Sequence, residues 1–337
     1  MPYSMRCGPR QSCTAATFLP NGPPVSWKAL RHALPIDWPL RATVMSFGKD
    51  KPMEPTLRPG TVRDAEACGR IGYEAFKAIA EQHGFPPDFP SADRAVGLLS
   101  KILTRPDVYS VVAELDGQVV GSNFLWEGDP IAGVGPITVV STAQNAGIGR
   151  KLMEFVLTRA NARRQMGVRL VQAAYHNRSL SLYSKLGFQA REPLSILQGP
   201  PLKLALNGYH VRKAIVHDLA VCDALCRSVH GHDRHGEIAH AIDDGTATVV
   251  EHSSRITGYA TGLGFFGHAV GLTNEEIKAL VGAAPTFTGL GFLLPTRNME
   301  LLQWCLNHGL RIVQPMTLMS LGLYQKPAGS FLPSILY

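Results

Sequence analysis

Apolar residues recur at helical spacing as soon as the proline-rich first 52 residues end. Thr61-x-x-Asp64 has the form of a capping box, and the apolar stripe after it continues to Gly84. A second helix is predicted over 91–104, because Pro106 cannot continue a helix. The patterned part of the chain is therefore expected to begin with two consecutive helices.

The pattern then changes from helical to strand-like. Segments 108–114 and 118–126 are predicted to be strands, joined at Asp116-Gly117, a dipeptide typical of a tight hairpin turn. The β-branched run Ile137–Val140 predicts a buried strand, and an amphipathic run follows it. Helices, hairpin, strand and helix in this order indicate a mixed α/β domain.

The second half of the chain echoes the first. Three pairs of segments are similar, namely 211–225 with 57–71, 247–267 with 111–128, and 287–322 with 168–199. Gly199-Pro200-Pro201 has the composition of a domain boundary. We therefore expect a poorly ordered extension over 1–52, a first domain over 53–199 and a related domain over 200–337.

A glycine-containing loop stands between the predicted strand and the helix after it. Gln144-x-x-Gly147-x-Gly149 lets the backbone approach a ligand, and the first turn of the helix offers unpaired N–H groups and the positive end of the helix dipole. Such a loop is a ready anion site. The spacing matches neither GxGxxG nor GK[ST], so the common dinucleotide and phosphate-loop motifs are excluded.

A second motif, Leu182-Tyr183-x-Lys-Leu-Gly187-Phe188, follows about thirty residues later. Together, in this order and at this separation, the two motifs resemble those of the GNAT superfamily of N-acetyltransferases. The resemblance implies an α/β fold of the mixed-sheet (α+β) kind, here as two tandem GNAT-like domains, each a mostly antiparallel twisted sheet flanked by helices.

The resemblance also implies the residues of an acetyl-CoA site. Backbone groups of Val139 and Val140 would bind the pantetheine arm and polarise the acetyl carbonyl, and Gln144 stands where the family accepts Gln or Arg. The N–H groups of the loop would hold the pyrophosphate; its residues are Asn145, Ala146, Gly147, Ile148, Gly149 and Arg150. Acetyl-CoA is thus the expected co-substrate, with no metal.

Tyr183 is the expected general acid, because a phenol near the sulfur can protonate the departing thiolate. The alternative is a core aromatic residue on an amphipathic helix. Asn177 is a further candidate for cofactor binding, although the family usually places its Asn seven residues before the tyrosine, where this chain has His176.

No general base stands out. Many relatives keep a glutamate in the stretch that corresponds to 132–140, which here contains no carboxylate. Glu127 and Asp129 are the nearest candidates, and a water chain or an amine of lowered pKa would serve instead.

The two halves are not equivalent. Where the first has its glycine loop, the second has Asn274-Glu-Glu-Ile, and Cys305 takes the place of Tyr183. We therefore expect one cofactor site, in the first domain, and a degenerate second domain.

The excess of basic over acidic residues is confined to particular segments of the chain. Of the 33 basic and 26 acidic residues, seven basic and two acidic ones fall within 1–52, so the remainder is nearly neutral and a general nucleic-acid role loses support. Segment 150–191, however, carries nine basic residues against Glu154 alone. This charge is expected to attract the phosphates of CoA or, alternatively, to form a solvated helix face.

Cysteine and histidine side chains are candidate metal ligands. The six cysteines lack framework spacing, which favours reduced thiols and a cytoplasmic protein. One cluster contains Cys222, Cys226, His230, His232, His235 and His240, but its spacing matches no standard zinc module. The loop 231–236 within this cluster is instead a candidate for the acceptor side, by analogy with the corresponding connection in the family.

The sequence thus predicts an acetyl-CoA-dependent N-acetyltransferase acting by direct attack of a primary amine. The acceptor is a small-molecule or peptide amine, with no nucleic-acid or membrane partner expected, and the protein would be a monomer or a homodimer. The alternatives are a non-catalytic acyl-CoA-binding regulatory module and an interaction factor that acts through its basic tail. No apolar run reaches the roughly 18 residues that a membrane span requires.

Overall fold

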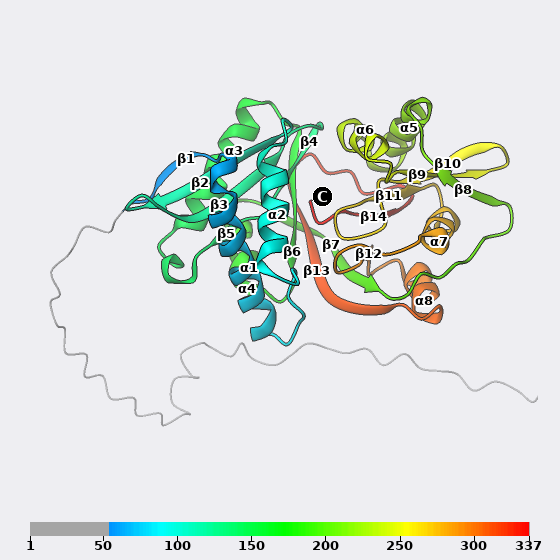
Figure 1. The fold of residues 1–337 in the computed structure, drawn as a ribbon. Helices are drawn as coiled ribbons and strands as arrows, with labels where there is room; N and C mark the ends of the chain where they lie inside the picture. The colour runs from blue at the N-terminus through cyan, green and yellow to red at the C-terminus, as the bar shows by residue number, and fades with distance from the viewer. Residues whose placement is uncertain (1–53, 337) are drawn as a thin grey trace, which may run out of the picture. The chain divides into compact units, whose positions relative to one another are not determined.

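A computed structural model describes residues 54–336, which contain two β-sheets and eight α-helices (Figure 1). The predicted extension over 1–52 lies outside the described residues. The larger sheet contains β1 (Thr56–Pro59), β2 (Val108–Leu115), β3 (Gln118–Trp126), β4 (Ile131–Val134), β5 (Thr138–Val139), β6 (Gly167–Ala173), β7 (Gln189–Gln198), β12 (Phe292–Pro295) and β13 (Arg311–Gly322). The smaller sheet contains β8 (Tyr209–Lys213), β9 (Thr248–His252), β10 (Arg255–Ala260), β11 (Ala269–Gly271) and β14 (Ser330–Leu332).

The helices lie between these strands along the chain. They are α1 (Ala65–Gln82), α2 (Ala92–Leu103), α3 (Ile148–Ala162), α4 (Asn177–Lys185), α5 (Leu219–His230), α6 (His235–Asp243), α7 (Asn274–Ala283) and α8 (Met299–Asn307). None of the helices within 54–336 combines the length and the apolar character needed to cross a bilayer.

Local sequence signals placed the first elements correctly. The carboxylate of Asp64 accepts the Thr61 N–H at 2.7 Å in a capping box ahead of α1, and Ser91 caps α2 through the N–H of Arg94. The predicted hairpin of β2 and β3 is confirmed, with Asp116 and Gly117 at φ 50° and 73°. Both central residues at positive φ are what a type I′ turn requires.

The strand predicted over Ile137–Val140 is shorter than expected. Only Thr138 and Val139 form β5, and they pair with β3 alone. A separate strand, β4, lies before it in the chain and was not predicted. Gly135-Pro136 divides the two strands. This division lets β5 leave the line of β4.

Two faces of the larger sheet carry separate cores. Val111, Ala113 and Leu125 alternate along β2 and β3 with Val112 and Phe124, and the two sets belong to different clusters. The first cluster contains the buried residues of α3 together with Tyr183 of α4, and the second contains Cys68 of α1 and Leu99 of α2. The sheet therefore has an α3/α4 face and an α1/α2 face.

The order of elements after residue 208 repeats the order in the first half, but the two halves share strands. In the larger sheet the order β6-β13-β7-β12 places β13 between β6 and β7, and β7 between β13 and β12 (Figure 1). All three pairings are antiparallel. The larger sheet is thus built from strands of both halves, with β13 of the second half inserted between β6 and β7 of the first.

The C-terminal strand has a distinct place. β14 pairs antiparallel with β11, contacts β12, and is buried throughout. In the order of elements, β11 and β12 of the second half correspond to β5 and β6 of the first. β14 therefore lies against both strands of the second half that take these places.

Candidate active site

The strands β4 and β6 are the parallel pair on which the site is built. Their pairing runs from Ile131 opposite Gly167 to Gly133 opposite Arg169 and then stops. Beyond this point β5 pairs only with β3, while β6 continues beside β13 on its other edge. The chain segments therefore diverge, and the facing edges of β5 and of residues 170–173 have no strand between them among the described residues.

Val139 and Val140 differ in how they face this gap. The N–H of Val140 donates to the carbonyl of Val120 at 2.8 Å, and its own carbonyl accepts from Ala143 at 3.0 Å. Since backbone groups alternate in direction along an antiparallel strand, those of Val139 point the other way, toward β6. The Val139 carbonyl accepts from Nε2 of Gln144 at 3.1 Å. Of the two predicted backbone partners, only Val139 faces the gap.

The loop between β5 and α3 has the geometry of an anion site. Asn145 and Gly147 have φ of 68° and 79°, and Gly147 is the N-cap residue of α3. A Cβ at Gly147 would meet no heavy atom within 4 Å, and one at Gly149 would lie no closer than 3.7 Å to its neighbours. The N–H groups of the first turn, which have no partner within the helix, thus border open space.

Arg178 of α4 fixes this loop and was not singled out from the sequence. Its Nη1 donates to Oε1 of Gln144 and its Nη2 donates to Oδ1 of Asn145, each at 3.0 Å. Gln144 is thereby held between α4 and the carbonyl of Val139. The loop is tied to both walls of the gap.

The basic segment 150–191 is less available than its charge suggests. Arg159 forms two hydrogen bonds with the Glu127 carboxylate, at 2.9 and 2.6 Å, and Arg150 pairs with Glu154 at 2.7 Å. Arg169 is 2% exposed within β6. Part of the charge is therefore used in ion pairs, and Arg178 is an exposed cation directly at the loop.

Tyr183 lies on the buried side of α4, within the core of the α3/α4 face. Only 6% of it is exposed, and its ring meets that of Phe188 edge-on at 6.2 Å. Burial raises the pKa of its phenol to about 12, and the Ser179 hydroxyl opposes part of that effect. The phenol is therefore protonated at neutral pH, as a general acid must be.

Ser179 and His176 extend this arrangement toward the exposed start of α4. The Ser179 hydroxyl lies 2.7 Å from Nδ1 of His176. Burial, together with Arg178 and His83, lowers the pKa of His176. Helical spacing was the available signal, because residues 176, 179 and 183 fall on one face of the helix. Asn177, the predicted cofactor residue, is the first residue of α4 and is exposed.

The two carboxylates considered as bases have other partners. Glu127 is held by Arg159, and Asp129 accepts the N–H of Gly236, at the start of α6, at 2.7 Å. Glu127 is therefore held in an ion pair, and Asp129 holds the start of α6.

The α1–α2 connection supplies a carboxyl that the sequence analysis did not consider. Asp88 is half-buried; desolvation raises its pKa to about 6, while a hydrogen bond with Gln314 acts against this rise. Tyr175, just beyond β6, reaches Gln314 at 3.4 Å and stacks on Phe85 with ring centroids 4.4 Å apart. Asp88 therefore lies near the carboxyl end of β6.

The second half presents a different geometry at the corresponding positions. Glu276 accepts both the N–H and the hydroxyl of Thr273, at 2.8 and 2.6 Å, so a carboxylate occupies the start of α7. Ser330 of β14 donates to Oδ1 of Asn274 at 2.8 Å. Cys305 is fully buried in an apolar core. An anion would meet a negative charge here, and the C-terminal strand lies beside β11.

The cysteine and histidine cluster is distributed over separate contacts. Cys222 and Cys226 are buried in an apolar core, whereas His235 pairs with Asp223 at 2.7 Å and His240 bonds the Gly236 carbonyl through Nδ1 at 2.7 Å. Within residues 54–336 no three His, Cys, Asp or Glu side chains are grouped so that they could hold a metal ion.

Comparisons with known proteins agree with this geometry. The family described as "Acetyltransferase (GNAT) domain" matches residues 106–190, from just before β2 to the start of β7. An IAA acetyltransferase of Azospirillum brasilense is 32% identical over 108 residues, which are 31% of this chain and 70% of the relative.

Two solved structures resemble most of the chain. A Pyrococcus horikoshii protein assigned to the acetyltransferases has a TM-score of 0.62 at 17% identity and covers 84% of this chain and 93% of its own. A GCN5-related N-acetyltransferase from Sphaerobacter thermophilus has a TM-score of 0.54 at 14% identity, with 81% and 96% covered. These likenesses concern the fold, and they extend over both halves. Taken with the motifs and the sequence relative, they show that the chain belongs to the GNAT family of acetyltransferases.

Proposed function

We propose that the protein transfers an acetyl group from acetyl-CoA to a primary amine. The observation that carries this proposal is that the glycine loop and Val139 border one gap between β5 and β6, and that Tyr183 belongs to the core cluster against which Val139 packs. The N–H groups at 147–150 would hold the pyrophosphate, and the backbone of Val139, which faces the gap, would hold the pantetheine arm. When bound, acetyl-CoA supplies the activated thioester.

Tyr183 acts as the acid in this proposal. Its buried, protonated phenol donates to the thiolate that leaves when the amine attacks the acetyl carbon. In the tautomer that carries its proton on Nδ1, His176 donates to the Ser179 hydroxyl, which can then return a proton toward the phenol. The half-buried imidazole of His176 connects this path to the exposed end of α4.

The second half is proposed to lack a cofactor site of its own. Glu276 stands where an anion would bind, and β14 lies beside β11 where the first half keeps a gap. Its role in the proposal is structural, since β13 forms the neighbour of β6. We therefore expect one acetyl-CoA per chain.

Calorimetric titration of acetyl-CoA into the full-length protein tests this proposal. Gly149→Glu should abolish binding, because its side chain enters the open space beside the first turn of α3 with the wrong charge. Gly97→Glu is the control for the change in residue type, since Gly97 is an exposed residue of α2 where a Cβ meets nothing within 4 Å. One site that survives in the control and is lost in Gly149→Glu supports the proposal, and no binding to the unmodified protein would refute it.

A non-catalytic acyl-CoA-binding module is the second candidate. It would bind acetyl-CoA but release no thiol with any amine, in the unmodified protein and in Tyr183→Phe alike. Thiol release that depends on both an amine and Tyr183 excludes it.

A further inference from the structure

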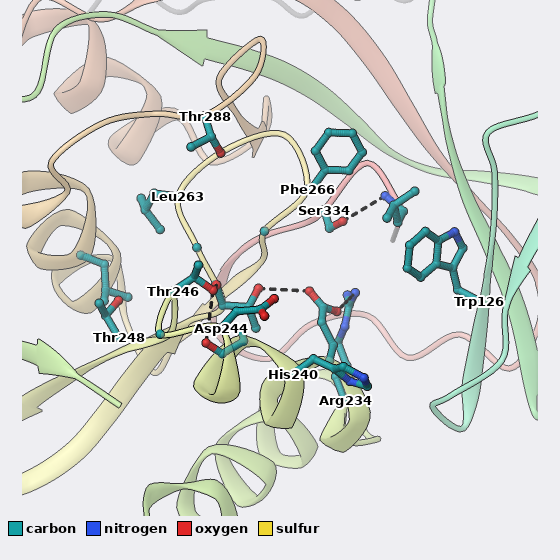
Figure 2. A pocket seen from close by; sticks show the side chains of 18 of the residues that line it. Trp126, Arg234, His240, Asp244, Thr246, Thr248, Leu263, Phe266, Thr288 and Ser334 are labelled. Carbon is teal, nitrogen blue, oxygen red and sulfur yellow. Dashed lines mark hydrogen bonds and ion pairs between the residues drawn. The ribbon is translucent and has the colours of Figure 1, made fainter. Parts of the chain in front are cut away.

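A large cavity lies on the α1/α2 face of the sheet, between residues of the two halves (Figure 2). Its volume is about 810 Å³, within the range of about 300–1,000 Å³ usual for small-molecule sites. The first half contributes α2 and the ends of β3 and β4, and the second half contributes α6 and the loop 261–267. Both halves of the chain thus form the wall of this cavity, which is open on one side.

The cavity reaches the point where the cofactor gap begins. Gly133, the last residue of β4 that pairs with β6, is in its wall together with Ile131. A Cβ at Gly133 would lie 2.1 Å from the carbonyl oxygen of Leu336, which also lines the cavity. The C-terminal segment therefore packs against this glycine.

The cavity and Tyr183 lie on opposite faces of the same sheet. Ile102 and Trp126 of the cavity wall belong to the core of the α1/α2 face, whereas Tyr183 belongs to that of the α3/α4 face. The gap between β5 and β6 separates the two. A nucleophile that enters from the cavity would therefore attack from one side while Tyr183 serves the leaving sulfur from the other.

Apolar side chains dominate one part of the wall. Phe266 keeps 39% of its surface exposed and Leu263 is half-buried, and both come from the loop that faces Trp126 (Figure 2). An exposed aromatic ring in a concave wall is a favourable contact surface for an apolar ligand.

The cavity wall carries charged groups of both signs, five basic and four acidic, and some of them form ion pairs. Arg105 pairs with Asp107 at 2.7 Å, and Arg234 pairs with Glu237. Glu237 also accepts from Nδ1 of His268 at 2.8 Å. These pairs leave little net charge for a highly charged ligand to meet, and they hold α6 in place. His240 adds a polar group, with Nδ1 engaged by Gly236 and the ring on the cavity wall (Figure 2).

We propose that this cavity is the acceptor site and that it takes a small amine with an apolar, aromatic-sized body. The assignment rests on the proposed transferase function. It also bears on the general base: apolar surroundings disfavour the ammonium form and leave more of the amine neutral for attack, and the Asp129 carboxyl, considered above as a base, lines the same cavity. A polyamine, charged along its length, or a side chain of a folded protein would fit these walls poorly.

The test fills the cavity and measures a defined probe, 2-phenylethylamine. Gly262 lines the cavity, and a Cβ there would meet nothing within 4 Å, so Gly262→Leu adds volume without a backbone clash. Gly97→Leu is the matched control outside the cavity. Binding of the probe to the full-length protein should weaken at least tenfold in Gly262→Leu and remain unchanged in Gly97→Leu. No binding to the unmodified protein, or equal binding to all three proteins, would overturn the assignment.

Steady-state thiol release provides the second readout. The kcat/KM for 2-phenylethylamine should fall at least tenfold in Gly262→Leu, with the KM for acetyl-CoA unchanged, and should exceed that for spermidine in the unmodified protein. Phe266→Ala, an exposed position with little risk to folding, should raise the amine KM severalfold.

Separate titrations distinguish the two proposals. If acetyl-CoA binds and turns over but Gly262→Leu leaves the amine kcat/KM intact, the acceptor assignment fails and the transferase proposal stands. If acetyl-CoA does not bind while the probe follows the expected variant pattern, the transferase proposal fails and the cavity remains a binding site.

Discussion

Nδ1 of His176 lies 2.7 Å from the hydroxyl of Ser179, one helical turn before the phenol of Tyr183. The three side chains line one face of α4, from its half-exposed first turn to its buried last turn. This arrangement lets a buried acid exchange protons without itself reaching water.

Removing the acid should show in kcat. Tyr183→Phe is expected to lower kcat by about 10²-fold while acetyl-CoA binding is retained, because only the proton donor is lost. Since the pKa of the phenol is raised to about 12, the unmodified protein should show no loss of kcat from Tyr183 below about pH 10. An unchanged kcat in Tyr183→Phe would leave the residue as a core aromatic.

Breaking the proposed proton path from His176 through Ser179 to Tyr183 should lower kcat less than removing the Tyr183 phenol does. Ser179→Ala removes one hydrogen-bonding hydroxyl, and we expect kcat to fall about fivefold, the equivalent of ~1 kcal/mol. Ser181→Ala on the exposed side of the same helix is the control. Equal rates for both variants would argue against the path.

Arg178→Ala should weaken the binding of acetyl-CoA and leave kcat nearly unchanged. The two hydrogen bonds from Arg178 order Gln144 and Asn145, so their loss should raise the Kd for acetyl-CoA about tenfold, or ~1.4 kcal/mol. The kcat at saturation should stay within about twofold. Lys185→Ala, at the far end of α4, controls for the loss of one positive charge, and a tenfold effect there would point to general attraction.

Asp88 makes stability depend on pH in an unusual direction for a carboxyl. Its pKa is about 6 in the folded protein against an ordinary 3.8, so ionisation penalises the folded state by up to about 3 kcal/mol. The penalty is absent below about pH 4, grows between pH 4 and 6, and is complete above 6. Asp88→Asn should therefore stabilise the protein at pH 8 and change little at pH 4, as measured by urea unfolding. A stabilisation that is the same at both pH values would contradict this.

No acetyl group should accumulate on cysteine. Burial raises the pKa of Cys68 to about 11 and that of Cys305 to about 12, and neither thiol is exposed. Mass spectrometry of protein quenched during turnover should find both unmodified, consistent with direct transfer to the amine. Acetyl on either thiol would require an acyl-enzyme step instead.

Features set by neighbouring residues could be predicted from the sequence. The capping box at Thr61 and the Asp116-Gly117 turn are local, and both are present. The glycine loop was placed at the start of α3 for the same reason.

Features that depend on distant partners could not be predicted. Glu127 was considered as a base because it lies near β4 in sequence, but Arg159 binds it from the next helix. Which of Val139 and Val140 turns its backbone groups toward the gap depends on which edge of β5 pairs with β3. The sequence does not encode that pairing locally. The cavity requires the relative placement of α2 and α6, which no local pattern encodes.

The position of β13 has a consequence for the synthesis of the protein on the ribosome. The wall of the cofactor gap, β6, is translated well before β13, the strand that flanks it and ends at Gly322. A nascent chain that stops after β7 carries both motifs yet leaves facing edges of β6 and β7 uncovered. Nascent chains should therefore gain acetyl-CoA binding only after β13 has emerged from the ribosome.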